Sequence, residues 1–268
     1  MAGGPDDGVE QAAHACRKAM AVAGRYATGG LVLEGGSDTT LVVTGAPIPA
    51  LNGVFCSAVE PDVMEIEHLA AAQDWTGQPW CIAVRGRPTD RLLTVGARYG
   101  LVRIREAALL VTDLRQAAQL EVEETGLSVR RVRGSDQALY NDTVAAGFGV
   151  SPDVFVRVNT AALLDSHEAS GYLAEAAGEP CATSLGVLIG NCLTVFNVAT
   201  VPGWRRRGAG RAVTLAAAEE GLAAGARWVA GLPTPMGSSL YASLGAGDVT
   251  DRWTFLEPAE RDPGARPS

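Results

Sequence analysis

The sequence predicts an α/β protein built around a mixed sheet. Along the chain, segments with apolar residues at helical spacing alternate with short β-branched runs that are typical of strands. With 268 residues, 47% of them hydrophobic, the chain can bury one large core or two of ordinary size. A polar, acidic segment at 113–126 favours two domains, 1–125 and 126–258, followed by a flexible tail at 259–268.

Composition limits the kinds of partner. The formal net charge of −8 argues against a nucleic-acid partner. No apolar run reaches the ~18 residues that a membrane span needs, and the N-terminal residues lack the pattern of a signal peptide. We therefore expect a soluble, cytoplasmic protein without a membrane partner. The sequence does not specify its oligomeric state.

The five cysteines indicate buried free thiols. Their number is odd, they are widely spaced, and they form no Cys-x-x-Cys pair. This pattern argues against a disulfide framework and against a zinc site, so no metal is expected.

The N-terminal half reads as mixed helices and strands. Apolar spacing predicts a helix from Val9 to about Tyr26, which ends at Gly29-Gly30. Strands at 31–34 and 41–44 flank a Gly-Gly-Ser-Asp turn signal, which indicates a hairpin. Further helices are predicted at 61–73 and 90–98, with strands at 80–84 and 101–112.

The C-terminal half has the predicted order β, α, α, β, β, β, α, β, α, β. The helices are expected from 135 to about 146, and at 152–164, 208–224 and 238–244. The strands are expected at 127–132, 170–176, 181–189, 192–201, 228–232 and 251–256.

An anion site is predicted where the strand at 192–201 leads into the helix at 208–224. A Pro-Gly turn, three arginines and Gly208-Ala209-Gly210 connect the two elements. The first N–H groups of a helix lack intrahelical partners, and the helix dipole places partial positive charge there. Gly208 and Gly210 have no Cβ, so a phosphate can approach the main chain. A diphosphate would fit.

Two common phosphate loops do not match these residues. A P-loop needs Gly-Lys-Ser/Thr, and the only lysine in the chain is Lys18. A dinucleotide fingerprint needs a third glycine where this chain has Val213.

The same run, Val-Ala-Thr-Val-Pro-x-x-Arg-x-Arg-Gly-x-Gly, resembles the acyl-CoA loop of the GNAT superfamily of N-acyltransferases. Downstream, Ser239-Leu-Tyr-Ala-Ser-Leu-Gly245 is similar to the family's Leu-Tyr-x-x-x-Gly-Phe helix end, with Ala246 in place of Phe. The resemblance covers the C-terminal half and implies a GNAT-like acyltransferase fold. The weaker repetition of elements upstream looks like the degenerate half of two-lobed, tandem members. An unrelated accessory α/β domain is the alternative there.

The resemblance implies a set of cofactor-binding residues. Acetyl-CoA would be the co-substrate, its diphosphate held by the loop and its pantetheine arm paired with the main chain of the preceding strand. In this sequence the corresponding residues are Val198, Ala199, Thr200, Arg205, Arg206, Arg207, Gly208, Ala209, Gly210 and Arg211.

The implied reaction is direct attack of a small-molecule amine on the thioester. Tyr241 matches the family tyrosine that protonates the departing thiolate. Glu175 is the leading candidate for the general base, with His167 and Asn197 as weaker ones, and no motif supports any of the three. No Gly-x-Ser-x-Gly elbow is present, which argues against a hydrolase with a nucleophilic serine. Because Ala246 replaces an aromatic residue, a non-catalytic acyl-CoA-binding or sensing module is the alternative. The acceptor is not specified.

Overall fold

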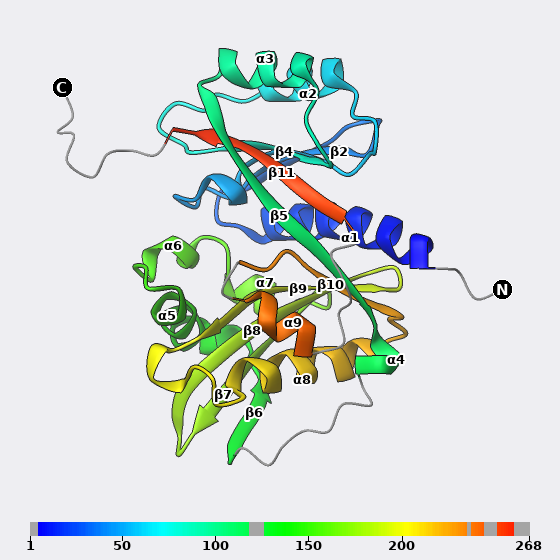
Figure 1. The fold of residues 1–268 in the computed structure, drawn as a ribbon. Coiled ribbons are helices and arrows are strands. Elements are labelled where there is room, and N and C mark those ends of the chain that lie inside the picture. The colour runs from blue at the N-terminus through cyan, green and yellow to red at the C-terminus, as the bar shows by residue number, and fades with distance from the viewer. Residues whose placement is uncertain (1–4, 118–125, 235–236, 244–250, 260–268) are drawn as a thin grey trace.

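The computed structural model describes residues 5–117, 126–234, 237–243 and 251–259 (Figure 1). Within these residues, eleven strands form one mixed sheet in the order β1-β2-β3-β4-β11-β5-β10-β9-β8-β7-β6. The strands are β1 Leu31–Glu34, β2 Thr39–Val43, β3 Gly53–Cys56, β4 Cys81–Arg85, β5 Leu101–Asp113, β6 Leu127–Arg131, β7 Ala169–Ala176, β8 Glu179–Ile189, β9 Cys192–Thr200, β10 Trp228–Gly231 and β11 Asp251–Pro258.

Helices cover both faces of this sheet, which makes the fold the mixed α/β class that the sequence predicts. The α-helices are α1 Pro5–Tyr26, α2 Val63–Ala71, α3 Asp90–Arg98, α4 Leu114–Ala117, α5 Gln137–Phe148, α6 Asp153–Val156, α7 Ala161–Asp165, α8 Ala209–Ala223 and α9 Ser238–Ser243. Short 3₁₀ turns lie at Pro49–Leu51, Gly134–Asp136 and Pro202–Trp204.

Neighbouring residues of one strand show how the helices divide between the faces. In β9, Cys192 packs in the cluster that contains α1, whereas Leu193 packs in the cluster that contains α8. In β3, Phe55 faces α1 and Val54 faces α2. Since successive strand residues point to opposite faces, α1 lies on one face together with α5 and α7, while α2, α3 and α8 cover the other.

Two long strands join the N-terminal and C-terminal parts of the sheet. The first part of β5 pairs with β11, and its last residues, Leu110–Asp113, pair with β10. The last strand, β11, lies between β4 and β5 (Figure 1). The predicted ranges 1–125 and 126–258 therefore share one sheet, and each contributes a strand to the other's part of it.

Helix α1 also spans both parts. Its alanines, among them Ala12 and Ala13, pack close to the sheet beside Trp228 and Trp253, and Ala19 packs in the cluster that contains α5. Small side chains let the helix approach the strands closely. The helix thereby fixes the C-terminal part, which carries the predicted site, against the N-terminal part.

Most predicted elements lie within a few residues of their expected bounds, and the predicted hairpin of β1 and β2 is confirmed. The single helix predicted at 152–164 is wrong, because α6 and α7 are two separate short helices. Thr160 causes the break: its hydroxyl accepts a hydrogen bond from the Leu163 N–H and begins a new helix. Of the predicted tail at 259–268, residues 260–268 lie outside the described residues.

All five cysteines are free and buried, as predicted. Burial raises the pKa of the Cys192 thiol to about 12. Burial, reinforced by Cys192, likewise raises the pKa of Cys16, so both remain neutral thiols at neutral pH. They act as small apolar core residues.

Trp253 tests whether the two parts unfold together. It lies in β11 and is 1% exposed. We expect Trp253→Ala to lower the free energy of unfolding by about 3–5 kcal/mol through the cavity it leaves, in one cooperative transition. Guanidinium denaturation followed by circular dichroism measures this. Trp253→Phe is the milder control, since the indole N–H has no partner among the described residues. Two separate transitions would contradict the shared sheet.

Candidate functional site

The candidate site begins where two parallel strands separate. Pairing between β9 and β10 ends at Thr194 and Ala230, although β9 continues to Thr200. Past this point, no strand of the described residues pairs with this edge of β9. A cavity of about 1080 Å³ lies along this edge, lined on one side by residues 195–200 and on the other by 232–234.

A β-bulge in β9 accompanies the separation. Thr183 of β8 pairs with Ala199, but Leu185 pairs with Phe196, so two β9 residues face the single residue Ser184. One of these two is Asn197, whose φ is 50°. Asparagine enters this left-handed region more readily than most residues. A bulge bends its strand and strengthens the local twist, which here directs the end of β9 away from β10.

The N-terminus of α8 closes one end of the cavity. Gly208 precedes the helix with φ of 82°, a conformation that favours glycine. A Cβ on Gly210 would lie only 3.0 Å from the Thr200 hydroxyl, so glycine permits the close approach of the helix to β9. Gly208, Ala209 and Gly210 all line the cavity. The positive end of a 15-residue helix therefore faces this space.

The four arginines of the loop differ in their positions. Arg205, Arg206 and Arg211 line the cavity. Arg205 also donates hydrogen bonds to the carbonyl oxygens of Gly147, at 3.0 Å, and Thr200, at 3.3 Å, and so ties the loop to α5 and β9. Arg207 does not line the cavity, and its guanidinium lies 5.1 Å from the Trp204 ring centre.

Tyr241 of α9 lines the same cavity and is 6% exposed. Burial raises the pKa of its phenol, with a smaller contribution from Cys16, so the phenol carries its proton at neutral pH. It packs against Gly231, where a Cβ would collide with the phenol. Gly245 and Ala246, the end of the predicted motif, lie outside the described residues.

Glu175, the leading candidate base, does not reach the cavity. It lies on β7 and accepts a hydrogen bond from Arg130 of β6 at 3.1 Å. The side chain pairs within the sheet surface because Arg130 lies on the neighbouring strand. Of the three candidates for the base, only Asn197 lines the cavity.

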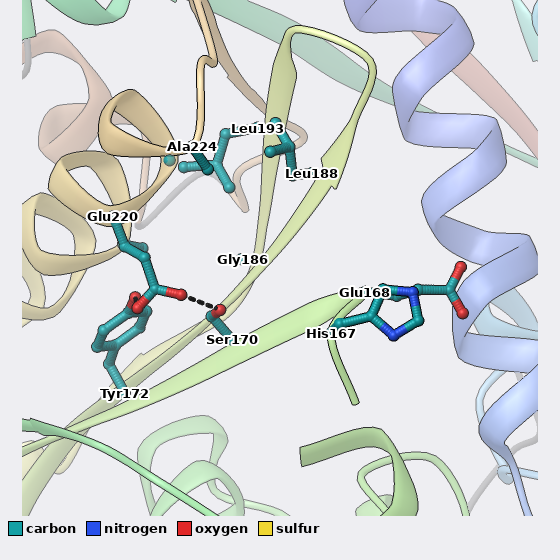
Figure 2. A pocket seen from close by; sticks show the side chains of 11 residues that line it. His167, Glu168, Ser170, Tyr172, Gly186, Leu188, Leu193, Glu220 and Ala224 are labelled. Atoms are coloured by element: carbon teal, nitrogen blue, oxygen red, sulfur yellow. Dashed lines mark hydrogen bonds between the residues drawn. The ribbon is translucent and has the colours of Figure 1, made fainter. Parts of the chain in front are cut away.

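His167 lies at a second, much smaller hollow of about 70 Å³ between α8 and the sheet. Figure 2 shows Glu220 bonded to Ser170 on one side of it and His167 on the opposite side. The Glu220 carboxylate accepts hydrogen bonds from Ser170 at 2.6 Å, from Arg131 at 2.7 Å and from Tyr172.

The Glu220 carboxylate has a structural role and is not a candidate base, because three side chains already donate hydrogen bonds to it. Partial burial alone would raise the pKa of Glu220, but the hydrogen bonds from Ser170 and Tyr172 and the charge of Arg131 lower it. The group stays ionised with its oxygens engaged. It holds α8 against β6 and β7, which fixes the direction in which the helix N-terminus points.

The N-terminal half has a comparable pair of parallel strands without a separation. Pairing of β3 with β4 continues to the end of β3, at Cys56 and Val84. At the start of α2, the Asp62 carboxylate accepts hydrogen bonds from the N–H groups of Met64 and Glu65. The chain's own side chain thus occupies the place where an anion would bind a helix N-terminus.

The structure also shows site residues that sequence reasoning missed. Gly147 and Phe148 at the end of α5, and Leu232 and Leu240, line the cavity. Asn159 accepts a hydrogen bond from Asn197 and donates one to Asn141, so these two residues support the cavity wall from behind Asn197. No sequence signal identifies them, because isolated asparagines and leucines at these spacings occur in any α/β protein.

None of the helices in the described parts of the chain is both long and apolar enough to cross a membrane. In the same residues, no three His, Cys, Asp or Glu side chains gather closely enough to hold a metal ion.

Comparisons with known proteins identify the fold. No family model matches the sequence, and no curated protein sequence matches it. Among solved structures, the chain is similar to a GCN5-related N-acetyltransferase from Kribbella flavida, with a TM-score of 0.66 and 16% identity over 94% of this chain and 96% of that one.

Two further structures agree. A GCN5-related N-acetyltransferase from Sphaerobacter thermophilus has a TM-score of 0.53 and 18% identity, covering 95% of this chain and 94% of that one. A conserved protein of unknown function from Staphylococcus epidermidis has a TM-score of 0.60 and 14% identity, covering 85% and 94% of the two chains. Over most of its length, the chain has the fold of the GNAT superfamily.

Proposed function

We propose that the protein is an N-acyltransferase that moves an acyl group, by default acetyl, from acyl-CoA to an amine of a small molecule in the cytoplasm. The observation that carries this proposal is the unpaired edge of β9 leading directly to the N-terminus of α8 within one cavity. An edge strand binds an extended, amide-containing chain, and a helix N-terminus binds an anion. Acyl-CoA joins a pantetheine arm to a diphosphate in this order.

The loop arginines complete the diphosphate site. Arg206 and Arg211 line the cavity beside Gly208 and Gly210. Guanidinium groups bind phosphate oxygens with two parallel hydrogen bonds, and they remain charged at any physiological pH. Arg205 is held by main-chain carbonyls, so we assign it mainly to shaping the loop.

The chemistry needs one proton donor and one proton acceptor. The amine nitrogen attacks the thioester carbon and forms the C–N bond, and the C–S bond then breaks. The departing thiolate takes a proton from the neutral phenol of Tyr241, which lines the cavity. The attacking nitrogen loses its own proton. With Glu175 paired to Arg130, we assign this proton to a water molecule held by Asn197, which passes it to solvent. The Tyr241 phenolate takes a proton back from solvent when the products leave.

A non-catalytic acyl-CoA-binding or sensing module is the second candidate. Among the described residues that line the cavity, the ionisable ones are three arginines and Tyr241, with no carboxylate or imidazole. A binding module would need only the cavity. Product formation decides between the two functions.

Cofactor binding is tested by calorimetry with acetyl-CoA and with free CoA. We expect one site per chain, because β3 and β4 remain paired in the N-terminal half. Arg206→Glu places a negative charge in the diphosphate site and should weaken binding by roughly ten- to hundredfold.

Arg207→Glu is the matched control, since it changes the charge equally one residue away from the cavity lining. It should weaken binding clearly less than Arg206→Glu. Wild-type protein that binds neither ligand at millimolar concentration would rule out the proposed function. Equal losses in the two variants would move the phosphate site elsewhere.

Tyr241→Phe tests the proposed acid. The substitution keeps the buried ring and removes the proton donor, so kcat should fall by about 10²–10⁴-fold with little change in the affinity for acetyl-CoA. CoA release with a panel of amines, confirmed by mass spectrometry of the acylated product, measures this. Undiminished turnover would exclude Tyr241 as the acid. Tight acetyl-CoA binding by the wild type without turnover of any amine would favour the binding module.

A further inference from the structure

Three buried or half-buried asparagines form a hydrogen-bonded chain that ends at the β9 bulge. Asn197 Nδ2 donates to Asn159 Oδ1 at 2.9 Å, and Asn159 Nδ2 donates to Asn141 Oδ1 at 3.0 Å. Asn141 Nδ2 donates a longer hydrogen bond, of 3.4 Å, to the main-chain carbonyl oxygen of Asn159. Asn159 is 0% exposed and Asn141 is 2% exposed. We call these residues the asparagine chain.

The asparagine chain connects three separate segments. Asn141 lies on α5, Asn159 lies between α6 and α7, and Asn197 lies in the bulge of β9. It therefore links the helical layer on one face of the sheet to the part of β9 that lines the cavity.

Side chains also hold the main chain at the bulge from the β8 side. The Thr183 hydroxyl donates to the Asn197 carbonyl at 2.8 Å. The phenol of Tyr140, on α5 beside Asn141, donates at 3.0 Å to the carbonyl of Ser184, the β8 residue opposite the bulge. The local conformation of β9 is thus fixed by side-chain hydrogen bonds where regular strand pairing is interrupted.

The positive φ of Asn197 in the bulge persists only when neighbouring groups stabilise it. A residue other than glycine at positive φ is strained, and a buried amide without partners is costly. The bonds between Asn197, Asn159 and Asn141 satisfy the amides and stabilise the strained residue together. Without them, β9 could relax toward regular pairing, and the edge that lines the cavity would lose its position.

We propose that the asparagine chain positions the β9 edge and thereby sets the affinity for the pantetheine arm of acyl-CoA, with Asn159 as its central positioning residue. This inference rests on the proposed function. The diphosphate end is formed by Gly208, Gly210 and Arg206, none of which takes part in the asparagine chain. Loss of Asn159 should therefore affect the arm more than the diphosphate.

The test compares the binding of CoA with that of ADP, which carries a diphosphate but no pantetheine arm. We expect Asn159→Ala to weaken CoA binding by about tenfold or more, because it breaks both side-chain bonds of a buried amide. ADP binding should stay within about threefold of wild type, as the arginine and helix contacts remain. Isothermal titration gives both constants.

Asn52→Ala is the matched control, because Asn52 is also a fully buried asparagine. It is 0% exposed and bonds to the main chain of Thr44, Gly45, Ala46, Ile48 and Pro79 in the N-terminal part. This variant should lower the melting temperature but leave CoA affinity within about twofold of wild type, since it lies outside the cavity lining.

Asn197→Ala tests the same link if Asn159→Ala does not fold. Alanine removes the amide but keeps the Cβ, and therefore keeps the strain at positive φ, so the same selective loss of CoA affinity is expected. CoA affinity equal to that of wild type in the folded variant would overturn the inference. An equal loss of ADP affinity, or an equal loss of CoA affinity in Asn52→Ala, would also overturn it. Wild-type protein that binds no CoA would instead refute the proposed function.

Discussion

The separation of β9 from β10 beyond Thr194 and Ala230 is the constraint on which the candidate site depends. In a parallel pair, each strand normally satisfies its neighbour's N–H and C=O groups. Here β9 continues past its pairing with β10 while it stays paired with β8, and its other edge faces a large cavity. The bulge at Asn197 redirects the strand, the asparagine chain holds the bulge, and α8 begins where the strand ends. Tyr241 reaches the same space from α9.

The two halves of the chain differ in whether their parallel strand pair separates. In each half, three strands, a helix, a strand, a helix and a strand follow one another. The N-terminal pair, β3 and β4, stays closed, and Asp62 fills the helix N-terminus. This half instead supplies support: β5 and α1 extend into the C-terminal part, while β11 returns to the N-terminal part. The N-terminal half thereby supports the part of the shared sheet in which β9 and β10 separate.

Local rules explain what could be predicted from the sequence. The glycines and arginines at 205–211 and the strand before them carry their signal within a few residues, so β9 and α8 lie close to their predicted bounds. Glu175 illustrates the opposite case. Its position on a strand was predictable, but its pairing with Arg130 depends on which strand lies beside β7. Asn159 joins residues from three distant segments, which no local pattern reveals.

We propose that the free edge of β9 receives the pantetheine arm by main-chain pairing. Amide hydrogen exchange of residues 195–200, measured with and without acetyl-CoA, tests this claim most directly. Hydrogen-bonded amides exchange slowly, so we expect slower exchange in this segment and at the start of α8 when acetyl-CoA is bound. Slower exchange at α8 alone, with 195–200 unchanged under saturating acetyl-CoA, would contradict it.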